Sequence, residues 1–179
     1  MNLITFSLFG DNPLYCQGAV ENANLARVIY PEWTARFYVA QDVPEDYIKE
    51  IEDYGAEVVR CEKKNSYDGL NWRFRPLSSL KVHYWISRDA DSRLSWRERN
   101  AVDEWMESDK AAHLLRDCHN HGFTIMAGMF GINNKLFHER YGVINLDNAN
   151  ANYRESDQKL LQEKLWPLIK HDHVCHYHW

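Results

Sequence analysis

The chain of 179 residues lacks the glycine-rich and cysteine motifs that most directly identify a cofactor site. It has no Gly-x-Gly-x-x-Gly and no Gly-Lys-Ser/Thr sequence, which disfavours dinucleotide and P-loop chemistry. The four cysteines are scattered, with no Cys-x-x-Cys pair. This pattern indicates a reducing compartment, in which the thiols serve as small core residues.

Long runs of basic or of apolar residues are missing as well. There is no basic run, and the net charge of -5 argues against a protein that coats nucleic acid. No apolar run approaches the length that spans a membrane, and residues 1–9 are too short and too regular for a signal peptide. We therefore expect no nucleic-acid partner, no membrane span and a cytoplasmic location, which is the host cytoplasm if the source is a virus.

Strand and helix patterns alternate over the first 60 residues. Residues 2–9 alternate as a strand and break at the turn Gly10-Asp11-Asn12-Pro13, and helical spacing then runs to Ile29. Strands at 35–40 and 56–60 flank a helix that starts at Pro44 and stops at Gly55. This order predicts a single α/β domain over residues 1–179, with a Rossmann-like, mostly parallel sheet and helices on both faces.

An apolar strand over residues 82–88 is followed by two acids one residue apart, Asp89 and Asp91. Neighbouring carboxylates repel each other unless a cation lies between them, and oxygen ligands suit Mg²⁺ or Mn²⁺. Ligands of such sheets bind at the carboxyl ends of the strands, where the Gly10-Asp11-Asn12 turn also falls. The alternative is an ordinary turn whose Asp and Ser side chains cap the next helix.

The rest of the chain predicts further elements around this strand. Residues 62–76 are polar and irregular, and Arg73 and Arg75 either close over a phosphate or belong to a plain surface loop. A capping box at Ser95-x-x-Glu98 opens a helix. Further expected elements are a short helix at 77–80, a strand at 112–117, an apolar glycine-containing stretch at 124–131, helices at 134–140 and 155–165 (the latter ended by Pro167), and a histidine-rich tail at 171–179.

Along nearly its whole length, the chain resembles the GT-A class of nucleotide-sugar glycosyltransferases. The resemblance is nearest to the retaining galactosyl- and glucosyltransferase type and to small transferase-like proteins of bacteria and large viruses. It rests on the first strand and its Asp-Asn turn, Arg36-Phe37-Tyr38-Val39, Arg73, Asp89-Ala90-Asp91, Arg116-Asp117, Met126-Ala127-Gly128, Asp157-Gln158 and a late histidine, His176.

The resemblance implies a role for each of these positions. Asp89, Asp91 and His176 would hold Mn²⁺ or Mg²⁺, which acts as a Lewis acid on the leaving diphosphate. Arg73 would grip phosphate or sugar, and Asp11 and Asn12 would contact base and ribose. The implied donor-binding residues are Leu8, Phe9, Gly10, Asp11, Asn12, Arg73, Asp89, Ala90, Ala127 and Gly128, and the implied catalytic residues, at the sugar, are Asp117, Asp157 and Gln158.

Several positions depart from the class or have a simpler interpretation. Met126 replaces an Asn that faces the sugar in the class, and Lys159 stands where some relatives have a second acid. Arg73 could form a loop salt bridge, Asp117 could cap a turn, and Asp157 could be helix-surface charge. Loop histidines His119 and His121 could contact the acceptor. His171, His173 and His178 compete with His176, and the tail could be disordered and scavenge metal.

The function expected from this resemblance is metal-dependent transfer of a hexose, with retention, from a UDP-linked donor to a glycan or other hydroxyl acceptor. One alternative is a non-catalytic nucleotide-sugar-binding module, or one domain of a larger transferase. Another is a phosphohydrolase of the haloacid-dehalogenase type, in which the first Asp of such a pair is a nucleophile. That class places the pair on its earliest strand, whereas three expected strands precede Asp89 here.

Overall fold

A computed structural model describes residues 1–116, 123–147 and 151–177, and seven strands of this part form one sheet. The strand order is β3-β2-β1-β4-β6-β5-β7. All neighbouring strands are parallel except β6, which runs antiparallel to both β4 and β5. The strands are β1 (Leu3–Leu8), β2 (Thr34–Ala40), β3 (Glu57–Cys61), β4 (Tyr84–Arg88), β5 (Ala112–Arg116), β6 (Met129–Asn133) and β7 (His173–Tyr177).

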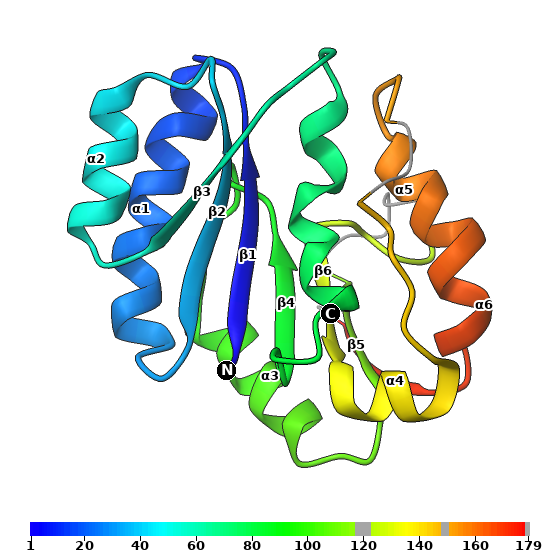
Figure 1. The fold of residues 1–179 in the computed structure, drawn as a ribbon. Helices are drawn as coiled ribbons and strands as arrows, with labels where there is room; N and C mark the ends of the chain where they lie inside the picture. Colours follow the sequence, from blue (N-terminus) through cyan, green and yellow to red (C-terminus); the bar gives the residue numbers. More distant parts are fainter. Residues whose placement is uncertain (117–122, 148–150, 178–179) are drawn as a thin grey trace.

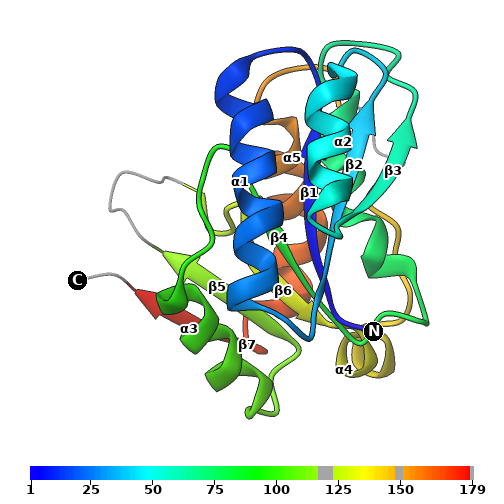
Figure 2. The ribbon, with the colours of Figure 1, turned by 90° about the vertical axis from the view of Figure 1, so that its left-hand side faces the viewer.

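Helices cover both faces of this sheet (Figure 1). Two of them, α1 and α2, lie together on one face and stand in front of the strands in Figure 2. No helix in the described part of the chain is long and apolar enough to cross a membrane. The helices are α1 (Pro13–Ile29), α2 (Glu45–Asp53), the 3₁₀ helix η1 (Asp68–Ser78), α3 (Trp96–Met106), α4 (Asn134–Tyr141), α5 (Ser156–Leu160), the π-helical turn η2 (Leu161–Leu165) and α6 (Trp166–Ile169).

The central position of β1 follows from its sequence. β1 pairs with β2 on one side and β4 on the other, so both edges of its backbone are hydrogen-bonded. Its side chains alternate between two cores, as the pleat requires. Ile4 and Phe6 belong to the core under α1, α2 and α3, whereas Leu3 belongs to the core under η1, α4 and α6. Every one of these side chains is fully buried, which fits the apolar run at 3–8.

Helix α1 packs directly on the chain segment that follows β4. A Cβ atom at Gly18 would overlap the carbonyl oxygen of Ala90, so only glycine allows this approach. One turn further along, the buried Asn22 donates from Nδ2 to the Ser92 carbonyl at 2.7 Å and accepts from the Leu94 amide at 3.0 Å. Helix α1 therefore fixes the course of the segment that contains Asp89 and Asp91.

The irregular loop expected over 62–76 is confirmed only as far as Tyr67, and the separate short helix expected at 77–80 was wrong. The chain forms one 3₁₀ helix from Asp68 to Ser78. The i, i+3 geometry of a 3₁₀ helix brings residues three apart onto one side. Phe74 and Leu77, with Trp72, are buried by this helix, and this burial outweighs the polar composition of the segment.

The C-terminal part also differs from expectation. The helix expected at 155–165 begins at Ser156 and continues to Ile169 through the π-helical turn at Leu161–Leu165. Pro167 does not end it, because this residue lies in the first turn of α6, where its missing N–H is tolerated. Within the expected tail, residues 173–177 form β7, which pairs in parallel with β5 from Ala112 to Arg116.

We expect Asn22→Ala to lower the free energy of unfolding by about 1–3 kcal/mol, because it leaves the buried Leu94 amide and the partly buried Ser92 carbonyl without their partner. Asn24→Ala, an exposed site on the same helix, is the matched control and should change it by less than about 0.5 kcal/mol. Urea denaturation measures both. Equal effects of the two substitutions would contradict the role assigned to Asn22.

Candidate functional site

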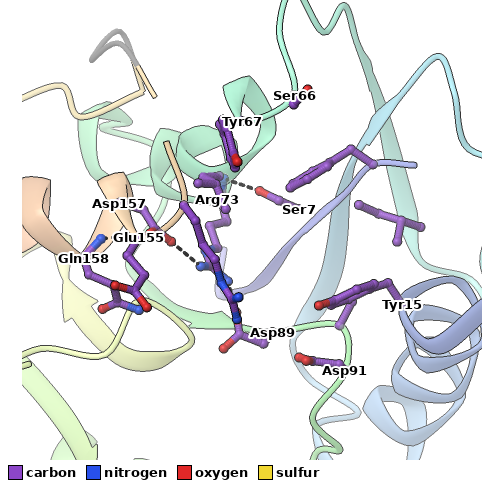
Figure 3. Close-up of a pocket in the computed structure, with 15 residues that line it drawn as sticks. Ser7, Tyr15, Ser66, Tyr67, Arg73, Asp89, Asp91, Glu155, Asp157 and Gln158 are labelled. Carbon is purple, nitrogen blue, oxygen red and sulfur yellow. Dashed lines mark hydrogen bonds and ion pairs between the residues drawn. The ribbon is translucent and has the colours of Figure 1, made fainter. Parts of the chain in front are cut away.

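A cleft of about 420 Å³ opens at the carboxyl ends of β1 and β4, beside the start of α5 (Figure 3). Its walls come from four segments that are distant in the sequence. Eight residues predicted to bind substrate or metal or to act in catalysis line it: Leu8, Phe9, Arg73, Asp89, Ala90, Asp91, Asp157 and Gln158. The other lining residues are Ser7, Tyr15, Ser66, Tyr67, Leu70, Arg154 and Glu155.

The guanidinium of Arg73 lies between two carboxylates at the base of the cleft. Its Nη1 pairs with Oδ1 of Asp89, and its Nη2 pairs with Oδ2 of Asp157 at 2.8 Å. The Arg73 and Asp157 side chains are only 7% and 4% exposed, so both charges are withdrawn from water. Burial opposes the charge on Arg73, but the two ion pairs outweigh it and raise its pKa. The structure therefore gives Arg73 two carboxylate partners, as the salt-bridge interpretation anticipated.

Two hydroxyls of β1 hold the backbone of η1 at this arginine. The Thr5 hydroxyl donates to the Arg73 carbonyl at 2.9 Å, and the Arg73 amide donates to Oγ of Ser7 at 3.1 Å. Both contacts lie on the strand whose end forms the cleft wall. The small polar residues that alternate with the apolar residues of β1 therefore place the charged side chain.

The two acids of the Asp89-Ala90-Asp91 sequence differ in their surroundings. Asp89 contacts Arg73 and lies so close to Gly128 that a Cβ atom there would overlap its carboxylate. Asp91 is exposed, lines the cleft near Asp89, and has no hydrogen-bond or ion-pair partner among the described residues. One carboxylate is thus fixed by protein contacts, and the other is open to solvent.

Ala127 and Gly128, expected at the sugar, lie behind the cleft instead of lining it. The Ala127 amide donates to Oε1 of Gln158 at 3.0 Å, and its carbonyl accepts from the Ser87 hydroxyl at 2.6 Å. Ala127 is fully buried by this arrangement. These two residues support Asp89 and Gln158 from behind, and their direct contact with a substrate stays a prediction.

The turn after β1 also lies outside the lining residues. Asn12 caps α1 by accepting from the Leu14 amide at 3.0 Å. Gly10 has φ of 78°, in the left-handed region, and its amide donates to Oδ1 of Asp42 at 2.9 Å. Asp11 is exposed. Contacts of Gly10, Asp11 and Asn12 with a base or ribose therefore stay predictions.

The structure does not bring His176 to the two acids. Its Nε2 lies 2.7 Å from Oε2 of Glu104, and its Nδ1 lies 3.1 Å from Nε2 of the buried His113. Glu104 belongs to α3, whose core side chains pack on the sheet face opposite to that of η1 and α5. Grouping His176 with Asp89 and Asp91 was therefore wrong for this structure. The strand position of His176 directs its ring toward α3.

A hard divalent cation fits the carboxylates that remain. Within residues 1–116, 123–147 and 151–177, no group of three or more His, Cys, Asp or Glu side chains could enclose a metal. Mg²⁺ and Mn²⁺ are commonly held by one or two carboxylates, with substrate phosphates and water completing the shell. Asp91, with the free edge of Asp89, matches that pattern, whereas the described residues form no closed structural zinc site.

Asp117, His119 and His121 lie outside the described residues, so their expected roles stay predictions. Most of the lining residues that the sequence did not single out, namely Ser66, Tyr67, Leu70, Arg154 and Glu155, come from segments without a clear periodic pattern. Tyr67 directly precedes η1, and Tyr15 lies in the first turn of α1. Arg154 and Glu155 precede α5, where Glu155 takes a left-handed backbone conformation with φ of 69°. Only the aromatic residues gave a signal, since tyrosines often line sugar and base pockets.

We expect Gly128→Ala to lower the free energy of unfolding by about 1–3 kcal/mol, because the added methyl group must displace the Asp89 carboxylate. In an Asp89→Ala background the same substitution should cost less than about 0.5 kcal/mol, since the obstructing group is gone. A double-mutant cycle in urea measures this coupling. Equal costs in both backgrounds would contradict the contact.

Because of the buried His113, we expect the folded state to lose stability at acidic pH. Burial, followed by the charges of Arg88 and His176, holds the pKa of His113 well below its usual range. Below about pH 6.5 the unfolded chain binds a proton at this histidine that the folded chain does not, so stability falls as the pH falls. The slope is up to about 1.4 kcal/mol per pH unit.

His113→Phe should remove this part of the slope between pH 7 and pH 5, while keeping an aromatic ring beside Trp105. Substitution of the exposed His171 by Gln is the control and should leave the slope unchanged. Urea denaturation at several pH values is the measurement. The assignment is wrong if His113→Phe and the wild type lose stability equally on acidification.

Sequence comparisons with protein-family models and with curated proteins give no match. Solved structures do match. A mannosyltransferase from Pyrobaculum calidifontis, in complex with GDP-Man and Mn²⁺, has a TM-score of 0.59 and 12% identity, over 97% of this chain and 54% of its own. S. aureus TarS 1-349, in complex with UDP-GlcNAc, has a TM-score of 0.55 and 9% sequence identity, over 78% of this chain and 47% of its own.

A nucleotidyltransferase shares the architecture as well. A putative glucose-1-phosphate thymidylyltransferase from Bacillus anthracis has a TM-score of 0.58 and 9% identity, over 98% of this chain and 87% of its own. The chain thus spans about half the length of the two glycosyltransferases above. At these identities the likeness concerns the fold. The chain has the Rossmann-like α/β fold shared by GT-A glycosyltransferases and nucleotidyltransferases.

Proposed function

We propose that this chain is the GT-A-like catalytic domain of a metal-dependent glycosyltransferase. It transfers a hexose from a nucleotide diphosphate sugar, in the first instance a UDP-linked one, to a glycan or other hydroxyl acceptor. The observation that carries the proposal is the convergence of Asp89, Asp91, Arg73, Asp157 and Gln158 in one cleft at the carboxyl ends of β1 and β4.

The cleft has the chemistry that a sugar nucleotide requires. Aromatic side chains of Phe9, Tyr15 and Tyr67 offer faces for a base or a sugar ring, and acids and an amide offer hydrogen-bond acceptors and donors. The two glycosyltransferases of the same fold carry GDP-Man with Mn²⁺ and UDP-GlcNAc in their solved structures. These complexes support a nucleotide-sugar donor, and the first also supports manganese.

Asp89 and Asp91 are the residues that would hold Mn²⁺ or Mg²⁺ in this cleft. When bound, the ion neutralises the charge that develops on the departing diphosphate. Arg73 pairs with both Asp89 and Asp157, and Gln158 and Asp157 line the cleft in which we expect the sugar to bind. Retention of the anomeric configuration remains our expectation from the family resemblance, and NMR of the product would measure it.

Nucleotidyl transfer is the second candidate, because the chain covers 87% of the thymidylyltransferase of the same fold. Attack on a nucleoside triphosphate needs strong cationic neutralisation of the phosphates. Here the loop after β1 carries Asp11, and no Lys or Arg precedes Arg27. The phosphohydrolase alternative is weaker still, since the Asp89 carboxylate is ion-paired and packed against Gly128 instead of free to attack.

A thermal-shift screen of UDP-, GDP- and TDP-sugars, with and without Mn²⁺, tests the proposal. We expect a donor to raise the melting temperature only when Mn²⁺ is present, because binding to the folded state stabilises it by mass action. Asp91→Asn should abolish most of this shift. Asp53→Asn on the exposed side of α2 is the matched control and should keep it.

Turnover separates an enzyme from a binding module. A catalytic domain should release free sugar from its donor slowly in water, and faster with a suitable hydroxyl acceptor, and Asp91→Asn should reduce both rates. Donor binding without turnover across many acceptors would instead favour a non-catalytic module or one domain of a larger transferase. A shift that survives Asp91→Asn, or that ignores Mn²⁺, would refute the proposed metal site.

A further inference from the structure

The charges in the cleft leave one cation without an assigned partner. Among the described lining residues the acids are Asp89, Asp91, Glu155 and Asp157, and the bases are Arg73 and Arg154. A bound diphosphate brings additional negative charge into this acidic cleft. Two groups can offset it: a metal at the Asp89 and Asp91 carboxylates, and a side-chain cation that is still available.

Arg73 is not available for that purpose. Both of its terminal nitrogens already contact carboxylates, and its side chain is only 7% exposed. Binding a phosphate here would require breaking at least one pair and leaving a buried charge uncompensated, which is strongly unfavourable. The arginine that the sequence singled out for a phosphate is therefore occupied by protein carboxylates.

Arg154 is in the opposite situation. It is exposed, it lines the same cleft, and within the described part of the chain no carboxylate or carbonyl pairs with it. A guanidinium is planar and presents paired N–H groups that match two phosphate oxygens. Its chemistry and its place among the residues that line the cleft suit a diphosphate bound there.

The backbone next to Arg154 is held in an uncommon conformation. Glu155 has φ of 69° and ψ of 10°, and it is the only non-glycine residue with positive φ among the described residues. This conformation costs about 1 kcal/mol for a residue with a side chain, and such costs concentrate at functional sites. The turn carries the chain from Arg154, on the cleft surface, to Asp157, which is buried against Arg73.

We propose that Arg154 binds the diphosphate of the nucleotide-sugar donor, and that the left-handed turn at Glu155 positions it to do so. This assignment rests on the proposed function and names the residue that recognises the phosphates. Arg154 contributes affinity for the diphosphate and none for the nucleoside. The division of roles is then complete, with Arg73 ordering the acids and Arg154 meeting the ligand.

Calorimetry of the full chain with UDP, GDP and the matching nucleosides, all in Mn²⁺, is the test. Arg154→Ala should weaken binding of the preferred nucleoside diphosphate by about tenfold or more, because a charge-assisted pair of hydrogen bonds is lost. Binding of the nucleoside should not change. The diphosphate affinity of Arg154→Lys should lie between those of the wild type and Arg154→Ala. Lys159 is an exposed cation on α5, and Lys159→Ala should bind as the wild type does.

Two substitutions at the turn separate position from charge. Glu155→Gly keeps the left-handed conformation and should retain diphosphate affinity, whereas Glu155→Val disfavours it and should reproduce the loss seen with Arg154→Ala. Circular dichroism checks that each variant is folded. Equal diphosphate affinity of wild type and Arg154→Ala overturns this assignment alone. A wild type that binds neither nucleoside diphosphate overturns the proposed function and the assignment together.

Discussion

The ion bridge Asp89–Arg73–Asp157 is the interaction on which the rest of the site depends. It joins the end of β4, the 3₁₀ helix η1 and the start of α5, three segments with no local connection. A buried arginine is unfavourable without partners, and two carboxylates would repel each other without the arginine. The three charges therefore stabilise one another, and the bridge links three of the segments that line the cleft.

The bridge also separates structural from exposed acids. Asp157 is almost fully buried, Asp89 pairs with the arginine and packs closely against Gly128, and Asp91 is exposed in the cleft. Three carboxylates that look equivalent in the sequence thus differ in how far protein contacts hold them in place. The Thr5 and Ser7 hydroxyls of β1 contribute to this arrangement, because they hydrogen-bond the backbone of Arg73 and so fix its position in η1.

The parts of this architecture that depend on local periodicity could be predicted from the sequence. The alternation in β1, the order of the first three strands, the capping box at Ser95 and Glu98, and the carboxylates after β4 all follow local rules. Helix η1 could not be predicted, because its buried face is created by tertiary contacts of Trp72 and Phe74. The prediction for His176 also failed, because the pairing of β7 with β5 determines the direction of its side chain.

The place of β1 in the sheet has a consequence for synthesis. This first strand has a neighbour on each side, and Leu3 is aligned with Thr34 in one and with Trp85 in the other. During translation it leaves the ribosome with one of its edges unsatisfied until β4 has followed. Pairings of such large sequence separation form slowly, so an apolar strand stays open to wrong partners in the nascent chain. Completion of the sheet around β1 therefore waits until β4 has been synthesised.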